Sequence, residues 1–302
     1  MKLPAAHPLE GFLLATIAAI GFSSKAIFVK LAYQAAPVDA ITLLSLRMAF
    51  SLPAFIGFAF FSHNKPAQQP LNRHDLLLIC GLGLVGYYLS SLLDFMGLHY
   101  LSAGLERLIL FLYPTLTVLL SAVLLKHAIT RKHVMALLLS YSGIALALLQ
   151  ETSHGGPDLW LGAGLVFAST LSYSVYLTGA GHAIARIGSV RFTALSMMVA
   201  SAATLLQFGL THPFSKLILP MHVYALAMGM ALFSTVLPVF ALSAAIRLIQ
   251  PGRAALIGSI GPISTIFMAY FILNEAITVA QLAGSALVLA GVWLIGRDRT
   301  PQ

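Results

Sequence analysis

The chain has 302 residues, of which 59% are hydrophobic and only 9% are charged, whereas a soluble domain carries about 25% charged residues. This small number of charged groups cannot cover the surface of a water-soluble fold of this length. The composition therefore excludes a soluble globular protein and indicates that lipid surrounds most of the chain. The net charge of +8 would suit a nucleic-acid partner only if the basic residues formed one surface patch.

Ten apolar stretches are long enough, at about 20 residues, to cross a bilayer, and their continuous apolar character predicts helices rather than barrel strands. In chain order they are Gly11–Tyr33, Asp39–Phe61, Leu76–Leu98, Ala103–Leu125, His133–Gln150, Trp160–His182, Val190–Leu210, Val223–Ile246, Gly252–Leu273 and Val279–Gly296. The first stretch is too long for a signal peptide and contains Lys25, so we expect it to be retained. The only cysteine, Cys80, lies in the third stretch and predicts neither a disulfide nor a metal site.

The basic residues are distributed unevenly between the two sides of the membrane. If the N-terminus is cytoplasmic, twelve of the seventeen fall in inner segments, namely Lys2, Lys65, Arg73, Lys126, Arg131, Lys132, Arg186, Arg191, Arg247, Arg253, Arg297 and Arg299. Three fall in outer connections or toward the outer ends of predicted helices, Lys30, Arg107 and Lys216, and the remaining two, Lys25 and Arg47, lie further within predicted helices. This bias predicts a protein of the cell inner membrane with both termini cytoplasmic, whose basic residues orient it and bind no nucleic acid.

The fourth and ninth stretches carry an internal repeat. "YPTLTVLLSAVLLKHAIT" (Tyr113–Thr130) and "GPISTIFMAYFILNEAIT" (Gly261–Thr278) are 148 positions apart and identical at six of eighteen positions. At an offset of 151, "GFLLATIAAIGFSSK" from Gly11 aligns with "GAGLVFASTLSYSVY" from Gly162. We therefore divide the chain at "TSHGGP" into two repeats, residues 1–151 and 158–302. Each holds five spans, an odd number, so equivalent helices would cross in opposite directions, as in the inverted repeats of secondary transporters.

Pro114 and Pro262 occupy the same place in the repeat, near the middle of the fourth and ninth spans. Proline removes a backbone hydrogen bond and bends a helix. Interrupted helices at matching positions of two inverted halves indicate a midplane binding site. The alternative is that both prolines only shape helix packing.

Four segments together resemble two EamA-type domains of the drug/metabolite transporter superfamily. They are "FSSKAIFVK" (Phe22–Lys30), "LRMAF" (Leu46–Phe50), "GLHYLSAGLERLILFLYPTLTVLLSAVLL" (Gly97–Leu125) and "GPISTIFMAYFILNEAIT" (Gly261–Thr278). The resemblance covers nearly the whole chain. It implies ten helices, with helices 1, 3, 4, 6, 8 and 9 around a central cavity, and export of small metabolites. The first half departs from the pattern, since Lys126-His127 replaces the Asn-Glu of the second half.

Five charged side chains are predicted at membrane depth: Lys25, Arg47, Asp94, Glu106 and Arg107. Such charges are rare and usually functional. We expect Lys25 to meet Asp94 or a substrate carboxylate, either as part of the binding site or as a structural ion pair. For Arg47, Glu106 and Arg107 the structural role is favoured, because they lie nearer the interface.

Helical spacing groups further polar residues with these charges. Steps of three and four place Tyr87, Ser91 and Asp94 on one face, and Glu106, Tyr113, Thr117 and Ser121 on another. The sixth span offers Ser169, Tyr173 and Tyr176, and the eighth offers Ser234 and Thr235. The predicted substrate-binding set is Lys25, Tyr87, Ser91, Asp94, Tyr113, Thr117, Tyr173, Tyr176 and Ser234.

No sequence signature of an enzyme accompanies these residues. The chain has no HExxH, no pair of intramembrane aspartates and no Walker motif, so we expect no catalysis, metal, cofactor or ATP drive. We predict a secondary active exporter of a small metabolite such as an amino acid, with Asp94 as the proton-coupling residue. A nucleobase or an organophosphate is the alternative substrate, and a non-transporting membrane protein or an intramembrane enzyme is less favoured. The partners are the substrate and the lipid bilayer, and a homodimer stays open.

Overall fold

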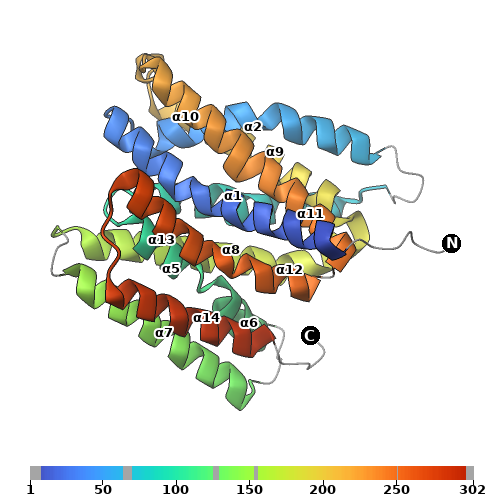
Figure 1. Ribbon diagram of the computed structural model, residues 1–302. Coiled ribbons are helices and arrows are strands. Elements are labelled where there is room, and N and C mark those ends of the chain that lie inside the picture. Colours follow the sequence, from blue (N-terminus) through green and yellow to red (C-terminus); the bar gives the residue numbers. More distant parts are fainter. Residues whose placement is uncertain (1–7, 64–69, 125–128, 153–155, 250, 297–302) are drawn as a thin grey trace.

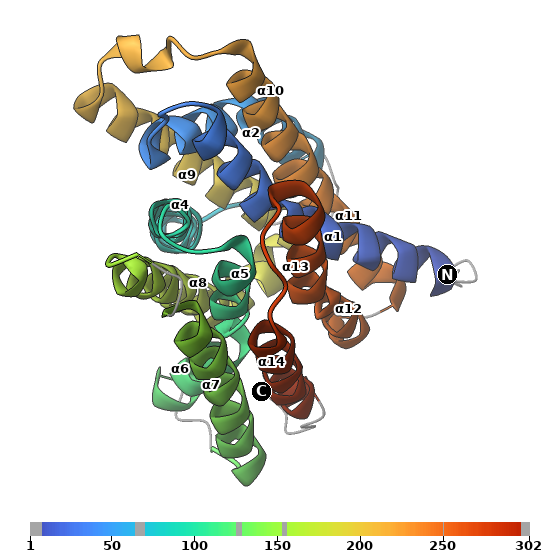
Figure 2. The ribbon, with the colours of Figure 1, turned by 60° about the vertical axis from the view of Figure 1, so that its left-hand side comes forward.

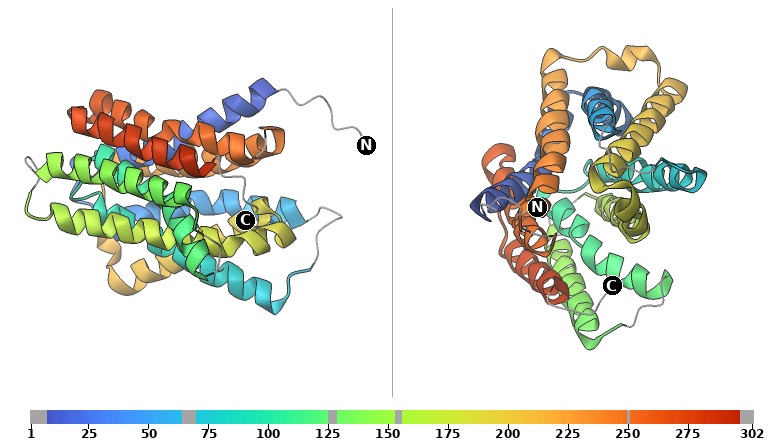
Figure 3. Two further views of the ribbon diagram at one scale, coloured as in Figure 1. Left: turned by 90° about the horizontal axis from the view of Figure 1, so that it is seen from below. Right: turned by 90° about the vertical axis from the view of Figure 1, so that its right-hand side faces the viewer.

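The computed structural model describes residues 8–63, 70–124, 129–152, 156–249 and 251–296, which form helices and short connections without strands. The helices run side by side along one direction, and α1 begins at the end of the bundle where α14 finishes (Figures 1 and 3). Several predictions fall outside the described residues: the middle of the "TSHGGP" connection, and the basic residues Lys2, Lys65, Lys126, Arg297 and Arg299.

The first half contains α1 (Pro8–Ala35), α2 (Ala40–His63), α3 (Arg73–Gly83), the π-helix η1 (Leu84–Leu89), α4 (Ser90–Gly97), α5 (Ala103–Leu110), α6 (Tyr113–Leu124) and α7 (Arg131–Thr152). The second half contains α8 (Leu159–Ile187), α9 (Ser189–Thr211), the short 3₁₀ helix η2 (Phe214–Leu217), α10 (Met221–Ala231), the π-helix η3 (Leu232–Val236), α11 (Leu237–Ile249), α12 (Pro251–Gly258), α13 (Ile260–Leu273) and α14 (Val279–Gly296).

Eight runs of helix within the described residues are long and apolar enough to cross a membrane, and the shorter apolar helices α13 and α14 follow them. The all-helical, multi-pass character predicted from the sequence is therefore confirmed. The ninth predicted span is shorter than expected, because the chain breaks at Ser259 and divides it into α12 and α13.

Four of the predicted spans contain an irregular segment, and two of these segments lie just before Pro114 and Pro262, the prolines expected to bend the fourth and ninth spans. The π-helices η1 and η3 lie 148 positions apart, within the third and eighth spans. The fourth span breaks at Phe111 and Leu112, and the ninth breaks at Ser259, again 148 positions after Phe111. Pro114 and Pro262 lie just after these breaks, in the first turn of α6 and α13, where a missing N–H leaves no helical hydrogen bond unmade.

Contacts between helices are also matched in the two halves (Figure 2). α1 packs on α11 and α13, as α8 packs on α4 and α6; α2 packs on α9, and α7 packs on α14. Small residues allow the closest of these approaches. A Cβ on Gly143 of α7 would lie 2.5 Å from the carbonyl oxygen of Gly284 in α14, and the reverse holds for Gly284. Close backbone contact through glycine is typical of helices that associate in lipid.

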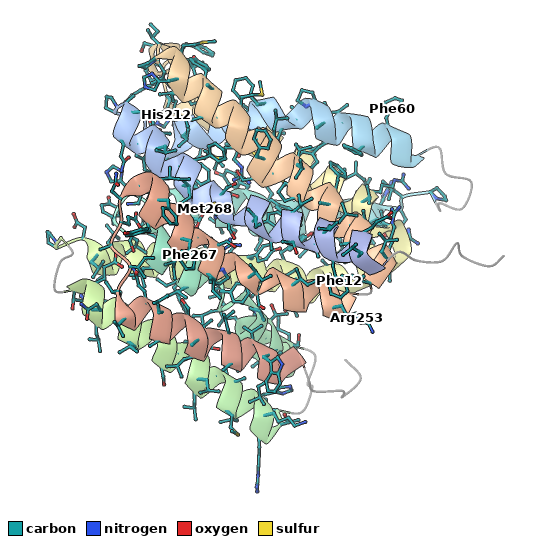
Figure 4. All side chains as sticks on the ribbon, viewed as in Figure 1. Phe12, Phe60, His212, Arg253, Phe267 and Met268 are labelled. Atoms are coloured by element: carbon teal, nitrogen blue, oxygen red, sulfur yellow. The ribbon has the colours of Figure 1, made fainter. Side chains whose placement is uncertain are left out.

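Apolar side chains both fill the bundle and cover its outside. The largest buried cluster joins α1, α2, α4, α9 and α10 through residues such as Val29, Met48, Phe55, Phe95 and Met197. Phe12, Phe60 and Phe267, labelled in Figure 4, are exposed. An apolar exterior around a packed apolar interior is expected where the solvent is lipid.

Candidate functional site

Lys25 of α1 joins two carboxylates from neighbouring helices. Its Nζ lies 2.5 Å from Oδ2 of Asp94 in α4 and 3.1 Å from Oε1 of Glu106 in α5. Asp94 is 2% exposed and Glu106 is 0% exposed, so both charges are buried. A buried charge is costly without an opposite partner, and here one ammonium serves two carboxylates. We call Lys25, Asp94 and Glu106 the charged triad.

Local hydrogen bonds hold the three helices of the charged triad together. The Tyr33 hydroxyl of α1 donates to the Phe95 carbonyl oxygen at 2.7 Å, which fixes α1 beside α4. Ser102 ends the short connection after α4 and caps α5 by accepting a bond from the Leu105 N–H at 3.2 Å. These contacts bring Asp94 and Glu106 to the same side of α1.

Two arginines lie at similar depth and differ in their partners. Arg47 of α2 is buried, donates through Nε to the Thr235 hydroxyl at 2.9 Å, and lies 5.5 Å from the centre of the Phe95 ring. Arg107 of α5 lies against Gly261 at the start of α13, where a Cβ would be 3.0 Å from its Nη2. The first contact links α2 to the π-helix η3.

The four predicted tyrosines form one continuous row. The hydroxyls of Tyr87 in η1 and Tyr176 in α8 are 3.0 Å apart. Tyr176 stacks on Tyr173 with ring centres 5.7 Å apart, and Tyr173 meets Tyr113 of α6 edge to face at 5.6 Å. The structure therefore joins aromatic residues from three helices. Tyr87 and Asp94, which helical spacing places on one face, contact different helices: Tyr87 contacts α8 and Asp94 contacts α1.

The predicted hydroxyl residues are engaged in more local contacts. Ser234 donates to the Met230 carbonyl oxygen at 3.0 Å, and Thr117 donates to that of Tyr113 at 2.6 Å, so both bond to their own helices. Ser91 is half-buried. Its neighbour Ser90 instead meets Ser169 of α8, with the two hydroxyl oxygens 3.0 Å apart.

Ser90 is a site residue that the sequence reasoning missed. For Glu106 the sequence favours a structural role, and in the structure it shares Lys25 with Asp94. Glu106 lies three residues after Ala103, the first residue of α5. Ser90 differs from Ser91 by one position, and the π-helix just before it changes which residue faces α8. Among the described residues no cluster of three His, Cys, Asp or Glu side chains could hold a metal ion.

Long apolar helices around a buried charged triad define a multi-pass membrane protein with a polar interior site. The chain belongs to the EamA-like transporter family, whose profile matches residues 9–149 and 160–297.

Two proteins of Bacillus subtilis (strain 168) are similar over most of their length. "Uncharacterized transporter YcbK" is 32% identical over 280 residues, which cover 91% of this chain and 88% of that protein. "Uncharacterized transporter YyaM" is 27% identical over 252 residues, which cover 82% of each. A solved structure described as "Crystal structure of protein" has the same fold, with a TM-score of 0.64, 18% identity, and coverage of 94% of this chain and 95% of that one. The chain is thus a transporter by family.

Proposed function

We propose that this transporter is a secondary active exporter that moves a small amine-bearing metabolite, such as an amino acid, across the cytoplasmic membrane by alternating access. One observation carries the proposal: the single ammonium of Lys25 is shared by two buried carboxylates. A substrate ammonium has the same charge and hydrogen-bond donors, so it can take the place of Lys25 on Asp94 or Glu106. The direction, export, rests on the family resemblance.

The same pair of carboxylates offers a site for a coupling proton. Because two carboxylates share one ammonium, either of them can take up a proton while Lys25 stays paired with the other. The proton expected on Asp94 is therefore assigned to the Asp94–Glu106 pair. Release of this proton to one side of the membrane and binding of substrate from the other side would couple proton movement to substrate movement.

The architecture proposed for this movement is a pair of inverted five-helix repeats, residues 1–151 and 158–302, giving ten membrane helices with both termini cytoplasmic. Support comes from the 148-residue offset shared by the π-helices and the helix breaks, and from the matched contacts of α1 and α8. Rocking of one repeat against the other about a central site is the usual motion of such transporters.

A nucleobase is the second candidate substrate. The row formed by Tyr87, Tyr176, Tyr173 and Tyr113 offers ring faces on which a base could stack. An organophosphate is less favoured, because the charged triad already neutralises Lys25.

Transport by purified protein in liposomes tests the proposal. Labelled amino acids, nucleobases and sugar phosphates would be offered under an imposed pH gradient. We expect amino acids to be carried by the wild type and not by Asp94→Asn or Glu106→Gln, made singly so that Lys25 keeps one carboxylate, with normal yield of each purified variant as the folding control. Transport of nucleobases or sugar phosphates alone would contradict the amine assignment.

A further inference from the structure

Arg107 is a charged residue expected at membrane depth, and among the described residues its Nε has no hydrogen-bond partner. The carboxylates of Asp94 and Glu106 are held by Lys25, and Arg47 is held by Thr235. Within the part of the chain that the structure describes, Arg107 makes no ion pair or hydrogen bond, and its Nε is buried without a partner. A buried polar atom left in this state calls for a reason, since satisfying it is normally favourable.

The charges at depth do not balance. Among the five charged residues expected at membrane depth, three cations, Lys25, Arg47 and Arg107, accompany two anions, Asp94 and Glu106, so this set carries one positive charge in excess. Arg107 follows Glu106 of the charged triad directly in α5, and Tyr113 of the tyrosine row begins α6 just after the break at Phe111 and Leu112. An anionic group of a bound substrate beside Arg107 would complete the charge.

The surroundings of Arg107 add to its positive character. Its guanidinium lies beside Gly261, in the first turn of the 14-residue helix α13. A helix begins with unsatisfied N–H groups and a partial positive charge. The Ser23 hydroxyl donates to the Gly261 carbonyl oxygen at 2.9 Å and so keeps α1, which also carries Lys25, against this helix start.

Gly261 makes room for the guanidinium. A Cβ at this position would lie 3.0 Å from Nη2 and 3.6 Å from Nε of Arg107. The equivalent position of the first half, 148 residues earlier, is Tyr113, whose ring belongs to the tyrosine row. The two half-helices α6 and α13 thus begin differently, one with an aromatic ring and the other with open backbone beside a cation.

We propose that Arg107 binds the carboxylate of the transported substrate, whose ammonium meets the Asp94–Glu106 pair and whose side chain lies along the tyrosine row. This inference rests on the proposed function and deepens it: the substrate is an amino acid with a free carboxylate rather than an amine alone. A guanidinium holds a carboxylate through two parallel hydrogen bonds. Lys25, which we had expected to bind the carboxylate, is already held by two carboxylates.

The test compares an amino acid with the amine that lacks its carboxylate, in liposomes containing purified protein. We expect Arg107→Gln to raise the KM for the amino acid by about 30-fold, the size typical of a lost charge-assisted hydrogen bond, and to leave the KM for the amine unchanged. Arg107→Lys keeps the positive charge but loses the two parallel N–H donors of the guanidinium, and should give a smaller increase in the KM for the amino acid. Gly261→Ala displaces the guanidinium and should resemble Arg107→Gln. Arg253→Gln, at an exposed arginine, is the matched control and should change neither KM.

The outcomes separate this inference from the proposed function. If the wild type carries neither the amino acid nor the amine, the proposed function fails and the carboxylate site fails with it. If the wild type carries the amino acid and Arg107→Gln leaves its KM unchanged, or weakens amino acid and amine equally, only the role of Arg107 is wrong. Unchanged transport of the amine by Arg107→Gln also shows that the variant is folded.

Discussion

For single residues of the charged triad, burial determines which substitutions the folded protein tolerates. Lys25 is the one ammonium beside two buried carboxylates. If one carboxylate is removed, the other still pairs with Lys25. Removing one partner of a buried ion pair is damaging when it leaves a charge uncompensated. The consequences of substitution should therefore differ within the charged triad.

We predict that Lys25→Met lowers the free energy of unfolding by about 3–5 kcal/mol, because two carboxylates then lose their only ammonium. Asp94→Asn and Glu106→Gln, made singly, leave a one-to-one pair and should stay within about 1 kcal/mol of the wild type while losing transport. Thermal unfolding of the purified variants checks this order. Equal destabilisation by Lys25→Met and Asp94→Asn would show a simple pair without a shared lysine.

From the sequence, Lys25 is expected to meet Asp94 or a substrate carboxylate, and the structure pairs it with Asp94; that Glu106 shares the same lysine does not follow from the sequence. Depth along a helix can be counted from its ends, so Lys25 and Asp94 could be matched. The direction in which Glu106 faces depends on how α5 is rotated relative to α6, and the break at Phe111 sets that rotation. Nothing in the residue pattern of the fourth span reveals where the helix breaks before its proline.

At the scale of helices, four spans depart from regular α-helix at matching positions. π-Segments and breaks leave backbone groups free of the helical ladder and are frequent at functional sites. The effect of the prolines on a helix could be predicted from the sequence, because the proline ring removes the backbone N–H whatever the surrounding structure. The π-helices η1 and η3 could not, since no residue type in LVGYYL or LFSTV marks a π-turn rather than an α-turn.

Pro114→Ala and Pro262→Ala should each reduce transport at least several-fold while expression and membrane insertion stay near normal. Alanine restores an N–H and allows α5 to continue into α6, or α12 into α13, which would straighten the irregular segment. Pro53→Ala, inside α2, is the matched control. Wild-type transport by both variants would show that the breaks do not serve the site.

Glu275 follows α13 and bonds the start of α5, accepting from the Ala103 N–H at 3.0 Å. Burial raises the pKa of Glu275 above its ordinary value of 4.5. The folded protein therefore keeps the carboxyl proton of Glu275 to a higher pH than the unfolded chain does. The contribution of this protonated carboxyl to the free energy of unfolding is complete below pH 4.5 and is lost as the pH rises through the raised pKa.

Glu275→Gln removes this titration. The stability of the wild type relative to Glu275→Gln should fall as the pH rises from about 4 to about 8. Thermal unfolding in detergent over this range measures the difference, and groups common to both proteins cancel. A difference that is constant or increases with pH would contradict the effect of burial.

The whole molecule combines an apolar exterior with helix contacts that repeat after about 148 residues. The same offset is visible in the sequence as the two Ala-Ile-Thr segments, from which we predict the division into halves. The pairing of α1 with α11 and of α8 with α4 was not predictable, because lipid-facing and protein-facing residues are equally apolar in these helices.

Orientation in the membrane is predicted from the basic residues, which favour cytoplasmic termini. Asp158 and Ser189 are exposed just before α8 and at the start of α9, at opposite ends of α8. In a Cys80→Ser background, Asp158→Cys should react with an impermeant thiol reagent in intact spheroplasts, and Ser189→Cys only after lysis. The reverse pattern would invert the topology.

Counterflow in proteoliposomes tests most directly whether the protein carries substrate by alternating access. Liposomes loaded with excess unlabelled amino acid are placed in a trace of the labelled compound, with no other gradient. A carrier that exposes one site to each side in turn exchanges the two, so the labelled amino acid should accumulate transiently above its external concentration. Asp94→Asn or Glu106→Gln, made singly, should abolish this accumulation. Equilibration without any transient accumulation in the wild type would indicate a channel and contradict transport through the charged triad.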